Sequence, residues 1–141
     1  MRYTFLVSAF ETRVRVRYAE TDQMGVVYHA NYLVWMEVAR VEFCREIGVD
    51  YATMEATGGV VIAVVEAHCR YLFPARFGDE IIIALTRSES NAKLLKFHYE
   101  MRRASDDRKI VKADTVHLYL SKSDFRPIRL PAQYHAAFGV K

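Results

Sequence analysis

The spacing of apolar residues predicts one strand and one long helix in the first part of the chain. Residues 12–18 alternate polar or charged with apolar side chains, which is typical of a strand with one buried face. Residues 32–47 are apolar on more than one side, which predicts a helix enclosed by other structure. Gly48 marks the expected helix end, and residues 49–57 form a short, loosely helical segment before a glycine pair.

Beyond the glycine pair the chain becomes rich in Val, Ile, Tyr, Phe and Thr, which predicts a series of strands. These strands are expected at residues 60–71, 80–88, 94–103 and 110–121. The last three follow one another through short connections, so hairpins and an antiparallel sheet are predicted. The fold class is therefore α+β, with the helix packed on one face of the sheet. Because one helix covers only one face, the other face or an open edge is expected to meet another subunit.

The C-terminal part carries Pro127 and Pro131 before a weakly amphipathic stretch at 132–138, which predicts a terminal segment laid on the surface. The chain has 141 residues and shows neither repeats nor linkers. A single domain over residues 1–141 is expected.

Composition and charge exclude several classes of protein. Apolar residues make up 52% and charged residues 26%, a globular composition, and no apolar run approaches the roughly 18 residues that span a bilayer. Residues 1–10 lack the features of a signal peptide, so a cytoplasmic protein without membrane insertion is predicted. The net charge of +3 is small and scattered, which argues against a nucleic-acid partner. Arg13, Arg15 and Arg17 are interpreted as a solvated strand face rather than an anion site.

The cysteines and histidines give no sign of a metal site. Cys44 and Cys69 are isolated, so both are expected to be buried thiols rather than zinc ligands or a disulfide. The five histidines are too scattered for an i,i+4 metal pair, and the chain has neither a G-x-S-x-G elbow nor a glycine-rich phosphate loop.

The segment between the first strand and the helix carries the candidate chemistry. It places Asp22 in a turn that contains Gly25 and runs into a helix start. Backbone N–H groups and the helix dipole favour negative charge at such a position. An aspartate in this kind of turn is, on local grounds alone, more often an acceptor of backbone hydrogen bonds than a catalytic group.

The block Asp22-Gln-Met-Gly25-Val-Val-Tyr28-His29-Ala-Asn31-Tyr32 resembles hotdog-fold thioesterases of the 4-hydroxybenzoyl-CoA thioesterase and YbgC-like acyl-CoA thioesterase group. The likeness continues through Trp35-Met-Glu37-Val-Ala-Arg40, Gly48, Tyr71, Pro74-Ala75, Phe77-Gly78-Asp79 and Ala113-Asp-Thr-Val-His117. It spans nearly the whole chain. The resemblance implies a long central helix wrapped by a five- to six-stranded antiparallel sheet. It also implies a homodimer with active sites at its interface, often paired into a homotetramer.

What the resemblance implies for activity is hydrolysis of an acyl-CoA to a free carboxylic acid and CoA. The family's catalytic carboxylate matches Asp22, and its accompanying tyrosine and histidine match Tyr18 and His29. Asp22 is expected to act either as a general base on water or as a nucleophile that forms a mixed anhydride. Tyr18 would support the carboxylate, and His29 would orient it, the water or the thioester. Coenzyme A belongs to the substrate, so no separate cofactor is expected.

Backbone N–H groups at the helix start near His29 are expected to polarise the thioester carbonyl. Gly25 lets the backbone approach a ligand, and Val26 and Tyr28 are further candidates for substrate binding. Asn31 is expected to fix the turn or cap the helix.

Several other side chains are candidates for roles in the site. Glu37, Glu42, Glu46, Glu66 and Asp79 are alternative carboxylates, but a Glu37–Arg40 ion pair and turn or surface positions explain them better. The basic candidates for contact with CoA phosphates are Arg70, Arg76 and Arg87. The aromatic candidates for the acyl pocket are Tyr28, Tyr32, Trp35, Tyr71 and Phe73, which could equally form the core.

Three other functions remain open at this point. A hotdog domain can bind acyl-CoA without hydrolysing it, although such a binder needs no carboxylate at position 22. A dehydratase or hydratase would carry a different motif, which this chain lacks. A scaffold role in an envelope or lipid-synthesis complex is compatible with hydrolysis.

Overall fold

The computed structural model describes residues 9–141, which form one curved sheet and one long helix. The strands are β1 (Phe10–Arg15), β2 (Val60–Tyr71), β3 (Glu80–Ser90), β4 (Leu94–Arg103) and β5 (Lys109–Ser121). The helices are α1 (Asn31–Glu46) and α2 (Tyr51–Ala56), with single 3-10 turns η2 (Tyr18–Glu20) and η3 (Ala132–Tyr134).

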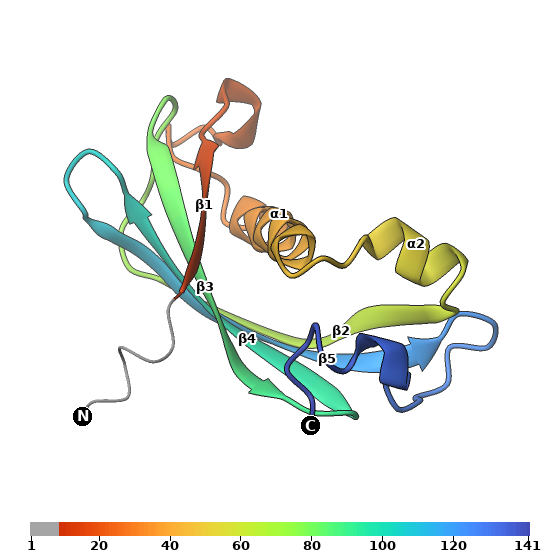
Figure 1. Ribbon diagram of the computed structural model, residues 1–141. Helices are drawn as coiled ribbons and strands as arrows, with labels where there is room; N and C mark the ends of the chain where they lie inside the picture. The colour runs from red at the N-terminus through yellow and green to blue at the C-terminus, as the bar shows by residue number, and fades with distance from the viewer. Residues whose placement is uncertain (1–8) are drawn as a thin grey trace.

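The sheet is antiparallel, and its strands lie in the order β1-β3-β4-β5-β2. It bends around α1, which lies along its concave face (Figure 1). The hairpins β3–β4 and β4–β5 follow from short connections, whereas β2 crosses to pair with β5 at the far edge. The predicted α+β hotdog fold, with its central helix and five-stranded sheet, is confirmed.

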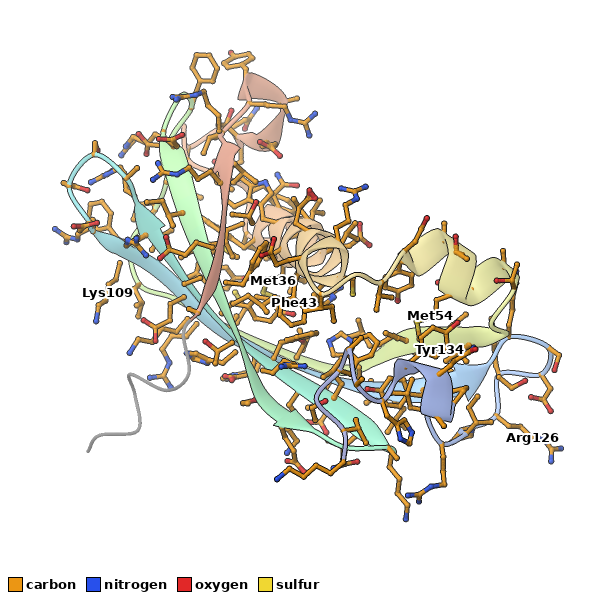
Figure 2. All side chains as sticks on the ribbon, in the orientation of Figure 1. Met36, Phe43, Met54, Lys109, Arg126 and Tyr134 are labelled. Carbon is orange, nitrogen blue, oxygen red and sulfur yellow. The ribbon has the colours of Figure 1, made fainter. Side chains whose placement is uncertain are left out.

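The core lies between α1 and the sheet. Along β4 the side chains alternate between buried and partly exposed, and along α1 the buried residues recur every three or four positions. Met36 and Phe43 project from α1 toward the sheet (Figure 2). The other side of α1 leaves Leu33, Val34 and Val38 exposed. The single chain therefore covers α1 on one side only, whereas the sequence predicted a helix that is enclosed.

The first strand is shorter than predicted. It ends at Arg15, and the backbone N–H of Val16 donates to Asp79 O at 2.9 Å. Tyr18 then begins a 3-10 turn in place of ending the strand. The predicted helix shifts by one residue, to Asn31–Glu46. Gly48 follows it in the left-handed region with φ of 82°, as a helix-ending glycine does.

The C-terminal segment differs from the prediction of a surface tail. Leu130 and Phe138 are buried, and the Phe138 ring packs edge-on against Tyr119 with centroids 6.3 Å apart. Tyr134 lies against the end of α2, near Met54 (Figure 2). The tail therefore completes the core beyond the C-terminal end of α1. The few large apolar residues of this segment are buried one at a time, so the sequence shows no regular spacing of apolar residues there.

The cysteines and the arginine row differ in how they meet solvent. Cys44 is buried, and burial raises the pKa of its thiol to about 11, whereas Cys69 is only half-buried. The arginine row is solvated as predicted, and Arg13 and Arg15 both form ion pairs with Glu80. Most of residues 1–10, for which no signal peptide is predicted, lies outside the described residues. Among residues 9–141, no helix is long and apolar enough to cross a membrane.

A buried polar chain links α1 to the sheet. Arg40 donates to the Tyr99 hydroxyl at 3.1 Å, and this hydroxyl shares a hydrogen bond of 2.7 Å with Thr115 Oγ1. Thr115 Oγ1 in turn bonds His117 Nε2 at 2.8 Å. His117 is 1% exposed, and its Nδ1 has no partner among the described residues. Burial, helped by the charge of Arg40, lowers the pKa of His117 from 6.5 to about 3.

We expect His117 to make the fold sensitive to acid. The folded chain protonates this ring only near pH 3, whereas an unfolded chain protonates it near pH 6.5. Its contribution to the free energy of unfolding is therefore complete above pH 6.5 and falls as the pH drops, by up to about 1.4 kcal/mol per pH unit. Urea unfolding between pH 7.5 and 5 should show a steeper loss for the wild type than for His117→Gln.

His98 is an internal control for this comparison. Its burial lowers the pKa, but hydrogen bonds and charge from Asp114 and Glu100 outweigh burial and raise it. His98 therefore stabilises the fold below its ordinary pKa and loses that effect as the pH rises. Because this opposite contribution is the same in both proteins, it cancels in the difference. Equal pH slopes for wild type and His117→Gln would contradict the role of His117.

Candidate active site

The loop between β1 and α1 is anchored by the buried carboxylate of Glu20, which is 7% exposed. Its Oε1 accepts the backbone N–H of Arg17 at 2.8 Å, and its Oε2 accepts the indole N–H of Trp35 on α1 at 3.0 Å. Burial opposes ionisation, but these hydrogen bonds and the Arg17 guanidinium lower the pKa of Glu20 overall. Glu20 is therefore a satisfied buried anion that ties the loop to the helix.

The main chain of Glu20 holds the far end of the same loop. Its carbonyl oxygen accepts the N–H of Tyr28 at 2.9 Å and the side-chain amide of Asn31 at 2.8 Å. Val27 N–H donates to Ala75 O at 2.9 Å, which ties the loop to the connection between β2 and β3. The residues between 20 and 31 are thus held at both ends.

Asp22 occupies the turn at the centre of this loop. Its Oδ1 accepts the N–H of Met24 at 2.8 Å, and its backbone N–H donates to Val26 O at 2.8 Å. Gly25 has a φ of 80°, a left-handed conformation that costs glycine little. The Asx-turn interpretation is therefore realised by one carboxylate oxygen. The other, Oδ2, has no protein hydrogen bond among the described residues.

Asp22 lines a cavity of about 270 Å³. The other lining residues are Met24, Val26, Val27, His29, Tyr32, Tyr71, Leu72, Phe73 and Pro74. They come from the anchored loop, the first turn of α1 and the chain that leaves β2. The cavity is mostly apolar, with one carboxylate and one imidazole, which is the composition of a small-molecule site.

The start of α1 supplies backbone donors beside this cavity. The N-cap residue, Ala30, offers no side-chain acceptor, and the N–H groups of His29 and Ala30 have no partner among residues 9–141. They lie at the positive end of the helix dipole. The Tyr71 hydroxyl donates to His29 O at 3.1 Å, and the two rings pack edge-on. This contact fixes the backbone at the position where a carbonyl oxygen could bind.

The structure separates the predicted site residues into two groups. Val26 and His29 line the cavity together with Asp22. Tyr28 packs on the His29 ring, with centroids 4.6 Å apart, but does not line the cavity. Tyr18 is 76% exposed and packs against Phe77, and no hydrogen bond joins it to Asp22 within the described chain.

Asn31 and Gly25 act on the loop. Asn31 is the first residue of α1 and bonds Glu20 O, so it fixes the turn and does not cap the helix. Gly25 lies outside the cavity lining, and its carbonyl oxygen accepts the Arg76 guanidinium at 3.4 Å. Of the three basic candidates for CoA, Arg76 is thus beside the loop. Arg87 instead donates to Ala137 O in the C-terminal tail.

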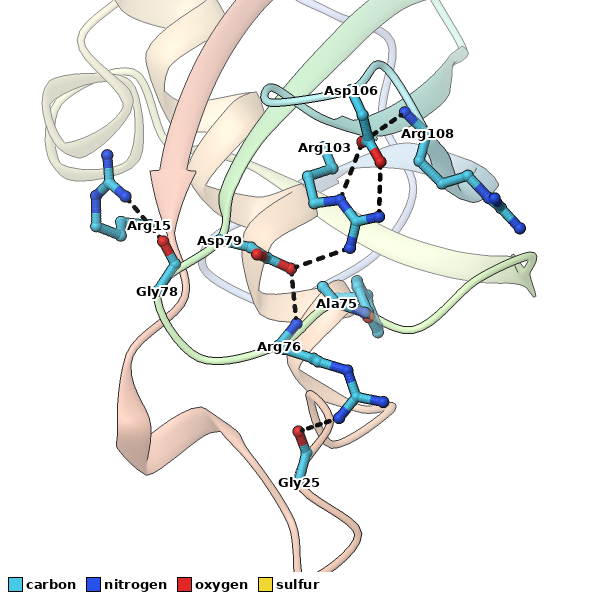
Figure 3. A network of polar contacts seen from close by, with 10 residues as sticks. Arg15, Gly25, Ala75, Arg76, Gly78, Asp79, Arg103, Asp106 and Arg108 are labelled. Carbon is cyan, nitrogen blue, oxygen red and sulfur yellow. Dashed lines mark hydrogen bonds and ion pairs between the residues drawn. The ribbon is translucent and has the colours of Figure 1, made fainter.

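The alternative carboxylates lie elsewhere. The predicted ion pair of Glu37 with Arg40 is wrong, because Arg40 turns inward to Tyr99 while Glu37 remains exposed. Glu42 pairs with Arg45. Asp79 has the expected turn role, since its Oδ2 accepts Arg76 N–H at 2.9 Å (Figure 3). The exposed Glu46 and Glu66 are likewise outside the cavity.

Sequence reasoning missed Glu20. Its local signal was an acid two residues before Asp22, where the family block begins, but its burial depends on Trp35, fifteen positions away. Among the aromatic candidates, Tyr32, Tyr71 and Phe73 line the cavity, while Trp35 belongs to the core. In the part of the chain that the structure describes, no group of three or more His, Cys, Asp or Glu side chains could hold a metal ion.

Comparison with known proteins agrees with this geometry. A family model described as the thioesterase-like superfamily matches residues 16–138. The chain belongs to this superfamily. The family match confirms the predicted resemblance to hotdog-fold thioesterases and the predicted enzyme class.

Two relatives and one solved structure illustrate the likeness of this thioesterase-family chain. The putative acyl-CoA thioesterase YneP of Bacillus subtilis is 38% identical over 125 residues, which are 89% of this chain and 86% of YneP. The acyl-CoA thioesterase YbgC of Haemophilus influenzae is 29% identical over 133 residues, 94% and 96% of the two chains. The hypothetical protein TT1821 of Thermus thermophilus superposes with a TM-score of 0.85 at 37% identity, over 92% of this chain and 96% of that one.

Removing the loop anchor should destabilise the fold. Glu20→Ala leaves the buried indole N–H of Trp35 and the partly buried backbone N–H of Arg17 without an acceptor, so we expect a loss of roughly 2–3 kcal/mol in the free energy of unfolding. Glu42→Ala, which breaks only a surface ion pair with Arg45, should cost less than about 1 kcal/mol. Urea denaturation of both variants tests the difference, and equal losses would count against the anchor.

Proposed function

We propose that this member of the thioesterase-like superfamily hydrolyses an acyl-CoA thioester to a free carboxylic acid and CoA. The observation that carries the proposal is the unpaired carboxylate oxygen of Asp22, in a cavity bordered by the start of α1. The names of YneP and YbgC, both acyl-CoA thioesterases, support the substrate class.

The thioester carbonyl would bind at the helix start. Its oxygen would accept hydrogen bonds from the free N–H groups near His29, which stabilise the negative charge that develops there. The thiol leaves without strong acid assistance because the pKa of a simple thiol is roughly 8.5. A single carboxylate is therefore sufficient for the chemistry.

Asp22 would act through the oxygen that its turn leaves free. It takes a proton from water as the water attacks the carbonyl carbon, or it attacks that carbon itself to form a mixed anhydride that water then hydrolyses. His29, on the same cavity wall, would orient the water or the thioester. Tyr18, directed outward in the single chain, would reach a site only across a subunit contact.

The proposed smallest unit is a homodimer, which can pair further into a homotetramer. One side of β2 faces no other strand of the described sheet, and Val64 and Val65 are each nearly half exposed there. The exposed side of α1 adds Leu33, Val34 and Val38. Two-fold pairing along the β2 edge would bury these side chains and satisfy the open edge.

Asp22→Asn should abolish most of the turnover. An asparagine oxygen can still accept the Met24 N–H, so the turn is kept while the charge is lost. We expect kcat/KM for acyl-CoA hydrolysis, measured by release of free thiol, to fall at least about 100-fold. Asp124→Asn is a matched control, because Asp124 accepts the N–H of Arg126 in the same local geometry on the exposed surface. It should retain wild-type activity.

The outcome also separates the alternatives. Undiminished activity in Asp22→Asn would contradict the role of this carboxylate. Saturable binding of acyl-CoA without thiol release by the wild type would instead favour a non-catalytic binding protein. A pull-down from lysate tests the scaffold role, which is compatible with hydrolysis.

A charge on the β2 edge should break the dimer. Val65→Glu would place a carboxylate at the proposed two-fold contact, so sedimentation equilibrium should report monomers where the wild type gives dimers or tetramers. Phe125→Glu introduces the same charge at an exposed apolar residue in the segment that follows β5. This control should leave the assembly unchanged. A monomeric wild type, or a dimeric Val65→Glu, would contradict the proposed interface.

A further inference from the structure

The two free backbone donors beside the Asp22 cavity belong to the peptide groups on either side of His29. In a trans peptide the C=O and the N–H point in opposite directions, and the described chain has no cis peptide bond. The direction of each donor is therefore fixed once the carbonyl oxygen of the same peptide group is held. The N–H of His29 shares its peptide group with Tyr28 O, and the N–H of Ala30 shares its peptide group with His29 O.

The two carbonyl oxygens are held in different ways. Tyr28 O accepts the backbone N–H of Asn31 at 2.9 Å, a bond within the turn that begins α1. His29 O accepts no backbone N–H within the described chain, and its hydrogen bond comes from the Tyr71 hydroxyl at 3.1 Å. The orientation of the peptide group that carries the Ala30 N–H thus depends on a side chain from β2.

Tyr71 is itself well placed to hold this peptide group. It is the last residue of β2, and the N–H of the next residue, Leu72, donates to Ile110 O at 2.8 Å. Its ring packs edge-on against His29, with centroids 6.2 Å apart, and lies 5.6 Å from the ring of Tyr32. The hydrogen bond joins two segments of one chain, so it does not require a second subunit.

The Tyr71 hydroxyl keeps the proton that it donates to His29 O. Burial, together with the Cys69 thiol beside it, raises the pKa of Tyr71 to about 12. A hydrogen bond to a peptide oxygen also polarises the peptide group and makes its N–H a stronger donor. Phenylalanine at this position would keep the ring contacts but lose both effects.

We propose that Tyr71 is a positioning residue for thioester hydrolysis, which orients the Ala30 N–H toward the thioester oxygen by holding His29 O. The proposal rests on the hydrolysis of acyl-CoA proposed above and adds a side chain that controls the backbone donors of that site. The thioester oxygen gains its negative charge only as the transition state forms. A misdirected donor therefore lowers kcat more than it weakens the binding of substrate.

Tyr71→Phe and Tyr51→Phe are the matched pair of variants. The Tyr51 hydroxyl also donates to a backbone carbonyl, Ile62 O at 2.9 Å, but at α2 and away from the cavity. Thiol release is measured on hexanoyl-, benzoyl- and lauroyl-CoA. In Tyr71→Phe kcat should fall about tenfold, less than the loss of a whole oxyanion donor costs, while KM changes little. Tyr51→Phe should keep the wild-type kcat.

Two further measurements separate positioning from a general loss of structure. The first is the Kd of S-hexyl-CoA, a thioether that lacks the carbonyl oxygen, which should be the same for Tyr71→Phe and the wild type. The second is the chemical shift of the Ala30 amide by NMR, which reports the hydrogen bond at the other end of the same peptide group. This shift should move in Tyr71→Phe and stay in place in Tyr51→Phe.

The outcomes distinguish this proposal from the proposed function. Wild-type kcat in a folded Tyr71→Phe, or an unchanged Ala30 shift, would overturn the role of Tyr71 but leave the thioesterase intact. An equal fall of kcat in Tyr71→Phe and Tyr51→Phe would overturn it as well, because the loss would then reflect stability. Thiol release from none of the three substrates by the wild type would count against the function itself, and the Ala30 shift would then decide whether Tyr71 holds this peptide group.

Discussion

The arrangement of the site depends on the buried carboxylate of Glu20. It accepts hydrogen bonds from Arg17, two residues after the end of β1, and from Trp35 on the central helix. An ionised carboxylate in the core is costly unless it is fully paired, and here two N–H groups and a guanidinium pair it. Loss of the charge would therefore loosen the loop at the point where strand and helix meet.

The position of Asp22 follows from this anchor. The loop is short, and its two ends are fixed by Glu20, so its central turn can only lie beside the first turn of α1. The turn uses one oxygen of Asp22 for its own stability and leaves the other without a protein partner among the described residues, on a side chain that lines the cavity. Asp22 can therefore be both the acceptor that stabilises the turn and the candidate catalytic carboxylate, since a different oxygen serves each role. Tyr71 likewise has two roles, because its ring lines the cavity and its hydroxyl donates to the His29 carbonyl oxygen.

The periodic spacing of apolar residues and the positions of turn-forming residues predicted most of the fold. Alternation along β4 and β5, the apolar faces of α1 and the glycine at its end each mark a local property of the chain. The predictions were wrong where a contact between residues far apart in the sequence determines the structure. Arg40 turns to Tyr99 because the buried hydroxyl needs a donor, and no local rule separates that from an ion pair with Glu37. Phe138 is buried because its ring packs against Tyr119 on β5, nineteen positions earlier in the chain.

The candidate site was predictable in part for the same reason. Asp22, Val26 and His29 share one short block, so sequence proximity brings them to one cavity. Tyr18 lies just before that block, but the early end of β1 turns it outward, toward Phe77. Glu20 is one acid among many in the sequence, and only its depth beside Trp35 distinguishes it. The contacts of the Phe73 ring with Arg103 and Arg108 join residues thirty and thirty-five positions apart, which no motif reveals.

The most direct test of this account is the turnover of Glu20→Gln at a temperature where the variant remains folded by circular dichroism. The variant keeps the shape of the side chain and leaves Asp22 untouched, but glutamine offers one acceptor oxygen to the Arg17 and Trp35 donors. If the anchor positions Asp22, kcat for acyl-CoA hydrolysis should fall about tenfold or more while the fold persists. Wild-type kcat in the folded variant would contradict the claim that Glu20 sets the geometry of the site.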